Sequence, residues 1–195
     1  MGLSVILPTK DEEKTIGRCL NGIFSQFFSK IECIIVDGYS KDRTVKIAES
    51  FAAQYPVKIY QMEGNIGEAR DYAVKMASGD IIFSTDADAV IKRKDHFCKI
   101  VSDLKDKEVA VWTGIVRDPD FYITVPVAGA NMAFRKRDYE SVGGFPPYST
   151  AEDVILFSRL QKLGRWIMRS DYEVIMPTNI FKWIGNWFSF FVLRN

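Results

Sequence analysis

Residues 3–37 read LSVILPTKDEEKTIGRCLNGIFSQFFSKIECIIVD, and this stretch decides the fold class. Its two ends, residues 4–7 and 33–36, are short apolar runs rich in β-branched residues, which is typical of buried strands. Between them the apolar side chains recur with a helical period: Thr15, Ile16, Cys19, Leu20, Ile23, Phe24 and Phe27. The stretch therefore predicts a strand, a crossover helix that covers one face of a sheet, and a second, parallel strand.

The same alternation continues through the first half of the chain. Further strands are expected at residues 57–60, 81–84 and 109–113. Helices are expected from near Asp42, with Val45, Ile47, Ala48 and Phe51 inward, and from about Gly67 to Met76. After the glycines and prolines of residues 143–147, another helix is expected at 151–163. This order predicts a doubly wound α/β fold with a mostly parallel sheet, which binds ligands outside the carboxyl ends of its strands.

Length and composition favour a single globular domain in a reducing compartment. The chain has 195 residues, and a net charge of +1 gives no reason to expect nucleic acid as a partner. Three widely spaced cysteines fit a cytoplasmic protein better than a disulfide or zinc framework. The first residues read as a strand and not as an export signal. We expect one domain over residues 1–177 and an aromatic segment over 178–195.

Polar clusters follow three of the expected strands. They are Pro8-Thr9-Lys10-Asp11-Glu12, Asp37-Gly38-Tyr39-Ser40-Lys41-Asp42 and Thr85-Asp86-Ala87-Asp88. Strand-end carboxylates can accept hydrogen bonds from ribose and a base, or hold a hard divalent cation through oxygen. Taken singly, Asp37-Gly38 also fits a turn and Asp42 a helix cap. The pair Asp86 and Asp88 points more clearly to a cation, because alternation along an extended segment brings both carboxylates to one side.

Two helix starts carry further charged residues. Arg70 lies in the first turn of a helix that opens with Gly67, which suits an anion site, although a surface arginine would give the same pattern. Glu152 and Asp153 begin the later helix. One of two adjacent carboxylates can interact with the helix dipole while the other acts as a general base.

Five motifs together resemble the ordered motifs of family 2 glycosyltransferases across about residues 3–165. They are SVILPTKDE at 4–12, IIVDGYSKDRT at 34–44, GEARD at 67–71, GDIIFSTDAD at 79–88 and EDVILFSRL at 152–160. The resemblance implies a GT-A fold and an inverting transfer of a sugar from a nucleotide-diphosphate sugar. It also implies a Mg²⁺ or Mn²⁺ ion, and a lipid-linked or saccharide acceptor that offers a hydroxyl or phosphate.

The resemblance further implies a role for each matching residue. Asp153 would be the catalytic base and Asp88 the metal ligand on the pyrophosphate. The donor would be bound by Pro8, Thr9, Glu12, Asp37, Arg70 and Asp86. The acceptor pocket would include Gly129, Ala130, Asn131 and Glu152, although residues 129–135 also fit an ordinary strand.

The match departs from the family pattern at two places. Many relatives carry a histidine shortly after the catalytic helix, whereas the single histidine here is His96, expected to be a partly exposed structural residue on the helix after Asp88. Gln161-Lys162-Leu163-Gly164-Arg165-Trp166 has one residue more than the Gln-x-x-Arg-Trp signature of processive synthases. We therefore do not expect a processive enzyme, and we expect Trp166 in the core.

Two other classes of function compete with glycosyl transfer. Asp86-Ala87-Asp88-Ala89-Val90 also resembles the start of a haloacid-dehalogenase-like phosphatase, in which Asp86 would be phosphorylated. That motif usually follows the first strand of its domain, and here three strands precede it. A nucleotide-sugar sensor without activity is the other alternative, but a sensor needs no general base such as Asp153.

The end of the chain suggests contact with a membrane. Ile180, Trp183, Ile184, Trp187 and Phe191 recur at helical spacing, with Lys182, Asn186 and Ser189 on another face. This predicts an amphipathic helix that lies in a membrane interface at the cytoplasmic face, since it is well short of the roughly 20 residues that span a bilayer. Packing on the domain or in a homodimer interface is one alternative. Another is that this chain is the front part of a longer protein whose next residues complete a membrane span. The basic clusters Lys92-Arg93-Lys94 and Arg135-Lys136-Arg137 are solvated faces or, alternatively, phospholipid contacts.

Overall fold

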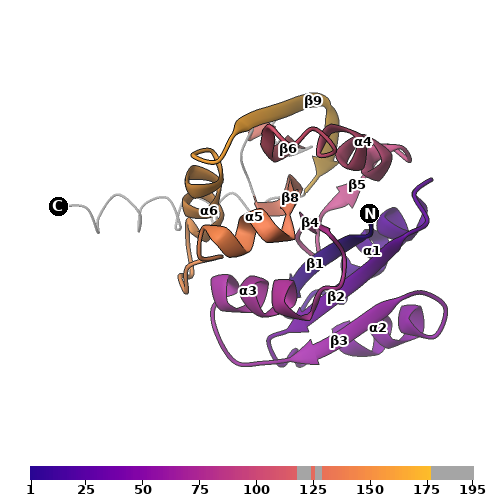
Figure 1. The fold of residues 1–195 in the computed structure, drawn as a ribbon. Helices are drawn as coiled ribbons and strands as arrows, with labels where there is room; N and C mark the ends of the chain where they lie inside the picture. Colours follow the sequence, from indigo (N-terminus) through magenta and orange to yellow (C-terminus); the bar gives the residue numbers. More distant parts are fainter. Residues whose placement is uncertain (118–123, 126–128, 177–195) are drawn as a thin grey trace.

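The computed structural model describes residues 1–117, 124–125 and 129–176 (Figure 1). The first half alternates strands and helices as expected: β1 (Leu3–Thr9), α1 (Ile16–Phe24), β2 (Ile31–Asp37), α2 (Thr44–Ala52), β3 (Val57–Gln61), α3 (Ile66–Met76) and β4 (Ile81–Ser84). The second half contains β5 (Val90–Ile91), α4 (His96–Asp103), β6 (Val109–Arg117), β7 (Thr124–Val125), the 3-10 turn η1 (Gly129–Asn131), β8 (Met132–Arg135), α5 (Lys136–Ser141), α6 (Glu152–Leu160) and β9 (Arg165–Ile175). All five expected strands are present.

One mixed sheet joins both halves in the order β3-β2-β1-β4-β8-β6-β9-β5, with β7 paired to β6. Strands β1 to β4 are parallel to one another, so the polar segments that follow β1, β2 and β4 reach the same edge. Strand β8 enters antiparallel between β4 and β6. This places η1, which directly precedes β8, at the end of β4 where Thr85 and Asp86 follow. The predicted α/β fold with a mostly parallel sheet is confirmed.

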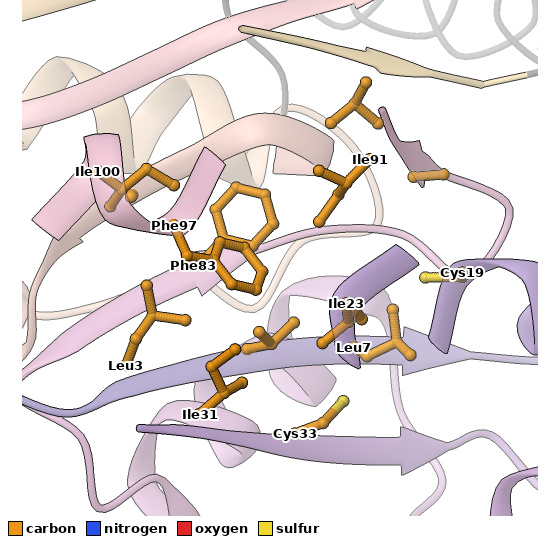
Figure 2. Packing of buried hydrophobic residues seen from close by; sticks show 14 of the residues in the cluster. Leu3, Leu7, Cys19, Ile23, Ile31, Cys33, Phe83, Ile91, Phe97 and Ile100 are labelled. Atoms are coloured by element: carbon orange, nitrogen blue, oxygen red, sulfur yellow. The ribbon is translucent and has the colours of Figure 1, made fainter. Parts of the chain in front are cut away.

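Each face of the sheet has its own hydrophobic core, because neighbouring residues of a strand point to opposite faces. Leu3, Val5 and Leu7 of β1 pack with α1 and α4 on one face, whereas Ile6 packs with α3, α5 and α6 on the other. Figure 2 shows the first of these cores, with Leu7 near Ile23 and Cys19 and with Phe83 near Phe97. The three-layer arrangement leaves the carboxyl edge of β1, β2 and β4 for the polar segments.

His96 corrects the expectation of a partly exposed residue. Its ring is fully buried in the first core, with edge contacts to Phe83, Trp112 and Tyr172. Its Nε2 lies 3.1 Å from the Asn131 amide oxygen. Burial lowers the pKa of His96 to about 4, against the opposing effect of the Asn131 hydrogen bond. His96 thus faces the sheet from the first turn of α4, on the same side as the buried Phe97 and Ile100.

Three smaller expectations are also corrected. Trp166 is 36% exposed and not part of the core, because β9 has a paired neighbour on only one side there; its indole nitrogen donates to Thr113 Oγ1 over 2.8 Å. The helix expected at 151–163 is shorter, Glu152–Leu160, and Ala151 before it has a positive φ of 61°. Arg135 is buried, not solvated, and donates to the carbonyls of Leu104, Asp106 and Lys107.

The expected C-terminal helix and the boundary at residue 177 lie outside the described residues. Among the helices that the structure does describe, none has the length and hydrophobicity needed to cross a membrane.

Candidate active site

A buried arginine joins two acidic motifs that lie far apart in the sequence. Arg70 lies on α3, whose start is fixed by a capping box between Asn65 and Glu68. The Arg70 side chain is 2% exposed; its Nη2 lies 2.6 Å from Asp86 Oδ1, and its Nη1 pairs with Glu152 Oε1. Burial acts to lower the pKa of Arg70, but the charges of Asp86 and Glu152 outweigh it and raise the pKa. The ion pairs thus connect the end of β4 to the start of α6.

Asp86 and Asp88 follow β4 in a compact turn at the edge of the sheet. The turn is closed by a hydrogen bond from the Ala89 amide to the Asp86 carbonyl, 3.0 Å long. The same carbonyl accepts from the buried thiol of Cys19, with Sγ at 3.4 Å, which ties the turn to α1. Both aspartate side chains remain half-buried, whereas Ala87 between them is buried. Exposure thus alternates along residues 86–88, but these residues form a turn and not the extended segment that the sequence predicted.

The two adjacent carboxylates at the start of α6 have different surroundings. Glu152 is 4% exposed and engaged with Arg70, whereas Asp153 is half-buried. Asp153 Oδ2 accepts from the Gly129 amide over 2.6 Å, and its Oδ1 accepts from the Val154 amide over 2.8 Å. Burial raises the pKa of Glu152 to about 6, and Asp153 adds to this while Arg70 opposes it. Asp153 is therefore the carboxylate that can reach a second molecule.

Gly129 lies between the arginine and Asp153. A Cβ built at this position would lie 2.3 Å from Arg70 Nη1 and 2.6 Å from its Cζ, so no larger residue fits without moving the guanidinium. Its amide meanwhile donates to Asp153. The absence of a side chain at residue 129 thus leaves room for the Arg70 guanidinium, and the backbone amide binds Asp153.

The other two residues of η1 face inward. Ala130 is 2% exposed, and Asn131 is fully buried. The Asn131 amide nitrogen donates to the carbonyls of Ile115 and Tyr172 over 3.1 and 3.0 Å. With its oxygen beside His96, the Asn131 side chain is occupied within the fold, and only its backbone could line an acceptor pocket.

The loops after β1 and β2 are joined by reciprocal hydrogen bonds. The Asp11 amide donates to Ser40 Oγ over 2.8 Å, and the Lys41 amide donates to Asp11 Oδ1 over 2.7 Å. The Glu12 amide donates to Thr44 Oγ1 over 2.7 Å. Asp11 and Tyr39 both adopt positive φ, 55° and 57°, which turns each loop sharply at the edge of the sheet.

The predicted donor residues of these loops lie together at that edge. Asp37 is fully buried; its carboxylate accepts from the Ser40 hydroxyl, from the Ser40 amide at 3.0 Å and from Gln61 Nε2 at 3.1 Å. Glu12 Oε2 accepts from Thr15 Oγ1 over 2.5 Å, and Pro8 is half-buried. The sequence reasoning missed Ser40 and Gln61 as partners of Asp37. A serine three residues after an aspartate is a turn signal that could have identified the first.

Several buried polar atoms near the edge have no hydrogen-bond partner among the described residues. They are Thr9 Oγ1, Ser84 Oγ, Thr85 Oγ1 and Arg70 Nε. An unsatisfied buried polar group costs about 1 to 3 kcal/mol, so such an atom usually has a partner such as a water, an ion or a ligand. Three of these four residues end or follow the strands that precede the polar loops, which places their polar atoms at the candidate site.

Comparison with known proteins identifies the family to which this arrangement corresponds. The family model described as Glycosyl transferase family 2 matches residues 4–164. The chain is 35% identical over 99 residues to poly(ribitol-phosphate) beta-N-acetylglucosaminyltransferase TarS of Staphylococcus aureus, a match that covers 48% of this chain and 17% of TarS. It is 32% identical over 96 residues to 4,4'-diaponeurosporenoate glycosyltransferase of Staphylococcus haemolyticus, covering 47% of this chain and 25% of that protein. The matched regions thus span a quarter or less of these two relatives.

Solved structures share the fold. Mannosyltransferase PcManGT from Pyrobaculum calidifontis, in complex with GDP-Man and Mn²⁺, matches with a TM-score of 0.82 and 25% identity over 99% of this chain and 64% of that chain. S. aureus TarS 1-349 in complex with UDP-GlcNAc matches with a TM-score of 0.78 and 23% identity, covering 90% of this chain and 58% of that chain. The GT-A-like arrangement of the sheet and its helices is therefore confirmed.

Proposed function

The chain belongs to glycosyl transferase family 2, and on that premise we propose that it transfers a sugar, with inversion, from a nucleoside-diphosphate sugar to an acceptor hydroxyl or phosphate. The observation that carries the proposal is the Arg70 bridge, which joins Asp86 after β4 to Glu152, the chain neighbour of Asp153 at the start of α6. Neither a phosphatase centred on Asp86 nor a sensor accounts for this arrangement, because neither requires a second carboxylate at the start of α6.

Asp153 is the base in this proposal. An inverting transfer needs a carboxylate that removes the proton of the acceptor as its oxygen attacks the anomeric carbon, opposite the departing diphosphate. The Gly129 and Val154 amides each donate to one oxygen of Asp153 and so fix its orientation, and the side chain is still half-buried rather than enclosed. Glu152 is less suited to the role, because Arg70 already binds it in the interior.

Arg70, Asp86 and the loops after β1 and β2 would bind the donor. Arg70 is buried and paired with Asp86 and Glu152, so it would act by holding Asp86 in position for the donor, while the polar loops contact the nucleotide. Asp37 and Glu12 would shape the same pocket through the loop network. The related PcManGT structure contains GDP-Man and the TarS structure contains UDP-GlcNAc, so the proposal names the donor class and not its base.

The residues present fit a Mg²⁺ or Mn²⁺ ion that is shared with the donor. Magnesium commonly uses one or two protein carboxylates and completes its shell with phosphate oxygens and water. Asp88, supported by Asp86, offers this set, and within the described residues no group of three or more acidic, cysteine or histidine side chains forms a fuller cage. When bound, such an ion would offset the negative charge that develops on the leaving diphosphate.

The acceptor is proposed to be a lipid-linked or saccharide molecule, with Gly129, Ala130 and the Asn131 backbone near its binding site. Contact of residues 178–195 with a membrane would bring a lipid-linked acceptor to the enzyme. The relatives differ in their acceptors by name, poly(ribitol-phosphate) for TarS and a diaponeurosporenoate for the S. haemolyticus enzyme. A homodimer interface is the alternative use of the segment.

Donor binding and turnover, measured on matched variants, test the proposal. Calorimetric titration with UDP-GlcNAc and GDP-Man, with and without Mn²⁺, should show metal-dependent binding of at least one donor. Asp88→Asn should abolish the metal-dependent part. Asp153→Asn should leave binding near normal but slow the turnover of that donor, including its hydrolysis, by roughly 100-fold or more, the scale of general base catalysis.

Asp80→Asn is the matched control, because Asp80 is an exposed carboxylate at the opposite end of β4. Asp80→Asn should change neither the metal-dependent binding of the donor nor its turnover. Unchanged donor affinity in Asp88→Asn with Mn²⁺ present would remove the metal role, and native turnover in Asp153→Asn would place the base elsewhere. A phosphoryl-aspartate at Asp86, formed from a generic phosphate ester, would instead support the phosphatase alternative.

A further inference from the structure

Two loops that are distant in the sequence form one surface away from the candidate active site. One loop follows α1 and contains Phe27; the other joins β5 to α4 and contains Lys94. The Phe27 amide donates to the Lys94 carbonyl over 2.8 Å, and Gln26 Nε2 donates to the Arg93 carbonyl over 2.9 Å. The hydrogen bonds hold Phe27 beside the basic cluster that the sequence contains at residues 92–94.

The Phe27 side chain projects into solvent from this surface. This corrects the prediction that it covers the sheet as part of the first helix, because α1 ends at Phe24 and Phe27 lies in the loop after it. It is 73% exposed, more than any other large hydrophobic side chain in the described residues. Its neighbour Phe28 packs against the core and anchors the loop. An apolar ring of this size, held outward by a fixed backbone, has an unfavourable contact with water that a partner could relieve.

Exposed basic side chains lie in both loops. Lys30, in the same loop as Phe27, and Lys92 and Lys94 in the other loop are exposed, and none forms an ion pair within the described part of the chain. Arg93 is different: its guanidinium is bound by Asp95 through two contacts of 2.9 Å and lies over the Tyr172 ring at 4.5 Å. Three lysines are thus left to balance an external anion.

We propose that the surface formed by Phe27, Lys30, Lys92 and Lys94 docks on a membrane that contains anionic phospholipid. One projecting aromatic ring can enter the interface between headgroups and acyl chains, while each nearby lysine gains about 1 kcal/mol from the negative surface. A protein partner would need about 800 Å² of complementary surface, whereas lipid headgroups adapt to a small set of separate side chains.

The position of this surface relative to the end of β9 supports the lipid partner. Strand β5, which leads into Lys92, is paired with β9 through Val90 with Ile175 and Ile91 with Val174. The described residues therefore end, at Met176, next to the strand that leads into the basic loop, and the sequence after them contains Trp183, Trp187 and Arg194. Two weak membrane contacts on one chain reinforce each other, because the second becomes intramolecular once the first has formed.

Vesicle flotation of the full chain tests the proposal. With phosphatidylcholine vesicles that contain about 30% phosphatidylserine, the wild type should bind, and raising NaCl from 0.1 to 0.5 M should weaken binding, because surface charge is screened. The double variant Lys92→Glu/Lys94→Glu should bind at least about tenfold more weakly, given the attraction of each lysine to an anionic surface. Phe27→Ser should also reduce binding severalfold.

Matched controls separate this surface from general charge and hydrophobicity. Lys105→Glu/Lys107→Glu makes the same charge change on the loop after α4, and Leu163→Ser removes another exposed apolar side chain. Both controls should bind as the wild type does. Thermal unfolding should be unchanged in Phe27→Ser, because its ring packs little against the fold.

Equal binding of the wild type and the Phe27 and lysine variants would overturn the proposal and assign membrane contact to other residues. Absence of wild-type binding to anionic vesicles would overturn it as well, and would leave an acidic protein as the partner to seek. Donor titration of the same variants should match the wild type. A failure of the proposed glycosyl transfer would therefore appear in the donor titration, and a failure of the proposed membrane surface would appear in the flotation.

Discussion

At the scale of single residues, Gly129 is where structure and chemistry are most closely joined. Its amide binds Asp153, and its missing side chain leaves room for the Arg70 guanidinium. We expect Gly129→Ala to displace Arg70 from Asp86 and Glu152. The expected result is a loss of about 1 to 3 kcal/mol of unfolding free energy, typical of overpacking, together with weaker donor binding. Chemical denaturation and donor titration measure the two effects.

Gly17→Ala provides the matched control for that substitution. Gly17 lies in α1, and a Cβ there would have only an ordinary contact of 3.7 Å with Ile47. Alanine in a helix interior should leave stability equal or raise it by up to about 1 kcal/mol. If Gly129→Ala behaved like Gly17→Ala in both measurements, the close packing of residue 129 against Arg70 would contribute neither to stability nor to donor binding.

His96 should make the fold sensitive to mild acid. Burial lowers its pKa to about 4 in the folded chain, compared with 6.5 for a free imidazole. Between these values the unfolded state binds the proton and the folded state does not, so the stabilising contribution is complete above pH 6.5 and is lost as the pH falls towards 4. The full difference corresponds to about 3 kcal/mol.

The single histidine allows a direct measurement of this effect. The imidazole signal in NMR spectra should keep its neutral chemical shift from pH 7 to near pH 4.5. His96→Gln should reduce the dependence of the unfolding free energy on pH in that window. Titration of the folded protein with a midpoint near 6.5 would contradict the buried position of the ring.

At the scale of secondary-structure elements, Glu32 joins neighbouring strands at the edge opposite the candidate site. Its Oε1 accepts from Ser4 Oγ over 2.6 Å and from the Ser78 amide over 2.6 Å, while Oε2 lies 2.9 Å from Lys58 Nζ. Burial acts to raise the pKa of Glu32, but these hydrogen bonds outweigh it and lower the pKa to about 2. One carboxylate thus links β1, β2, β3 and the loop before β4.

Glu32→Gln should therefore destabilise the fold at neutral pH without changing donor binding. The contribution of a carboxylate with a lowered pKa is present above its unfolded value, near 4.5, and is lost as the pH falls towards 2. We expect a loss of about 1 to 3 kcal/mol at pH 7 that shrinks in acid, measured by urea unfolding. Glu49→Gln, an exposed change on α2, should have no effect. Equal stability of the two variants would show that the link contributes nothing.

At the scale of the whole molecule, residues 178–195 should bring the domain to a membrane. Their aromatic residues recur with a helical period, and the apolar stretch from Trp183 to Leu193 is shorter than the roughly 20 residues that span a bilayer. In flotation with anionic vesicles, the intact chain should float and a chain ending at Pro177 should float much less. Equal behaviour, with neither chain floating, would remove the membrane hypothesis. Unfolding of the shortened chain would instead favour packing on the domain or between two copies.

The sequence by itself determined the fold class and the order of the acidic motifs. Hydrophobic periodicity is a local property, so the strands at 4–7, 33–36 and 81–84 and the helix at 67–76 could be predicted without knowledge of their partners. Parallel strands place their carboxyl ends at one edge, which is why Asp37, Asp86 and Asp88 could be grouped from the sequence. Membership of the family followed from the same ordered motifs.

Only the tertiary structure decided how these residues divide their roles. Glu152 and Asp153 are adjacent and chemically alike, yet the fold binds the first to Arg70 and leaves the second half-buried. Asn131 and His96 are 35 residues apart, and pairing of β8 between β4 and β6 is what buries them together. Burial and ion pairing depend on contacts between residues far apart in the chain. A periodic pattern records which face of an element is apolar, but not which partner will cover it.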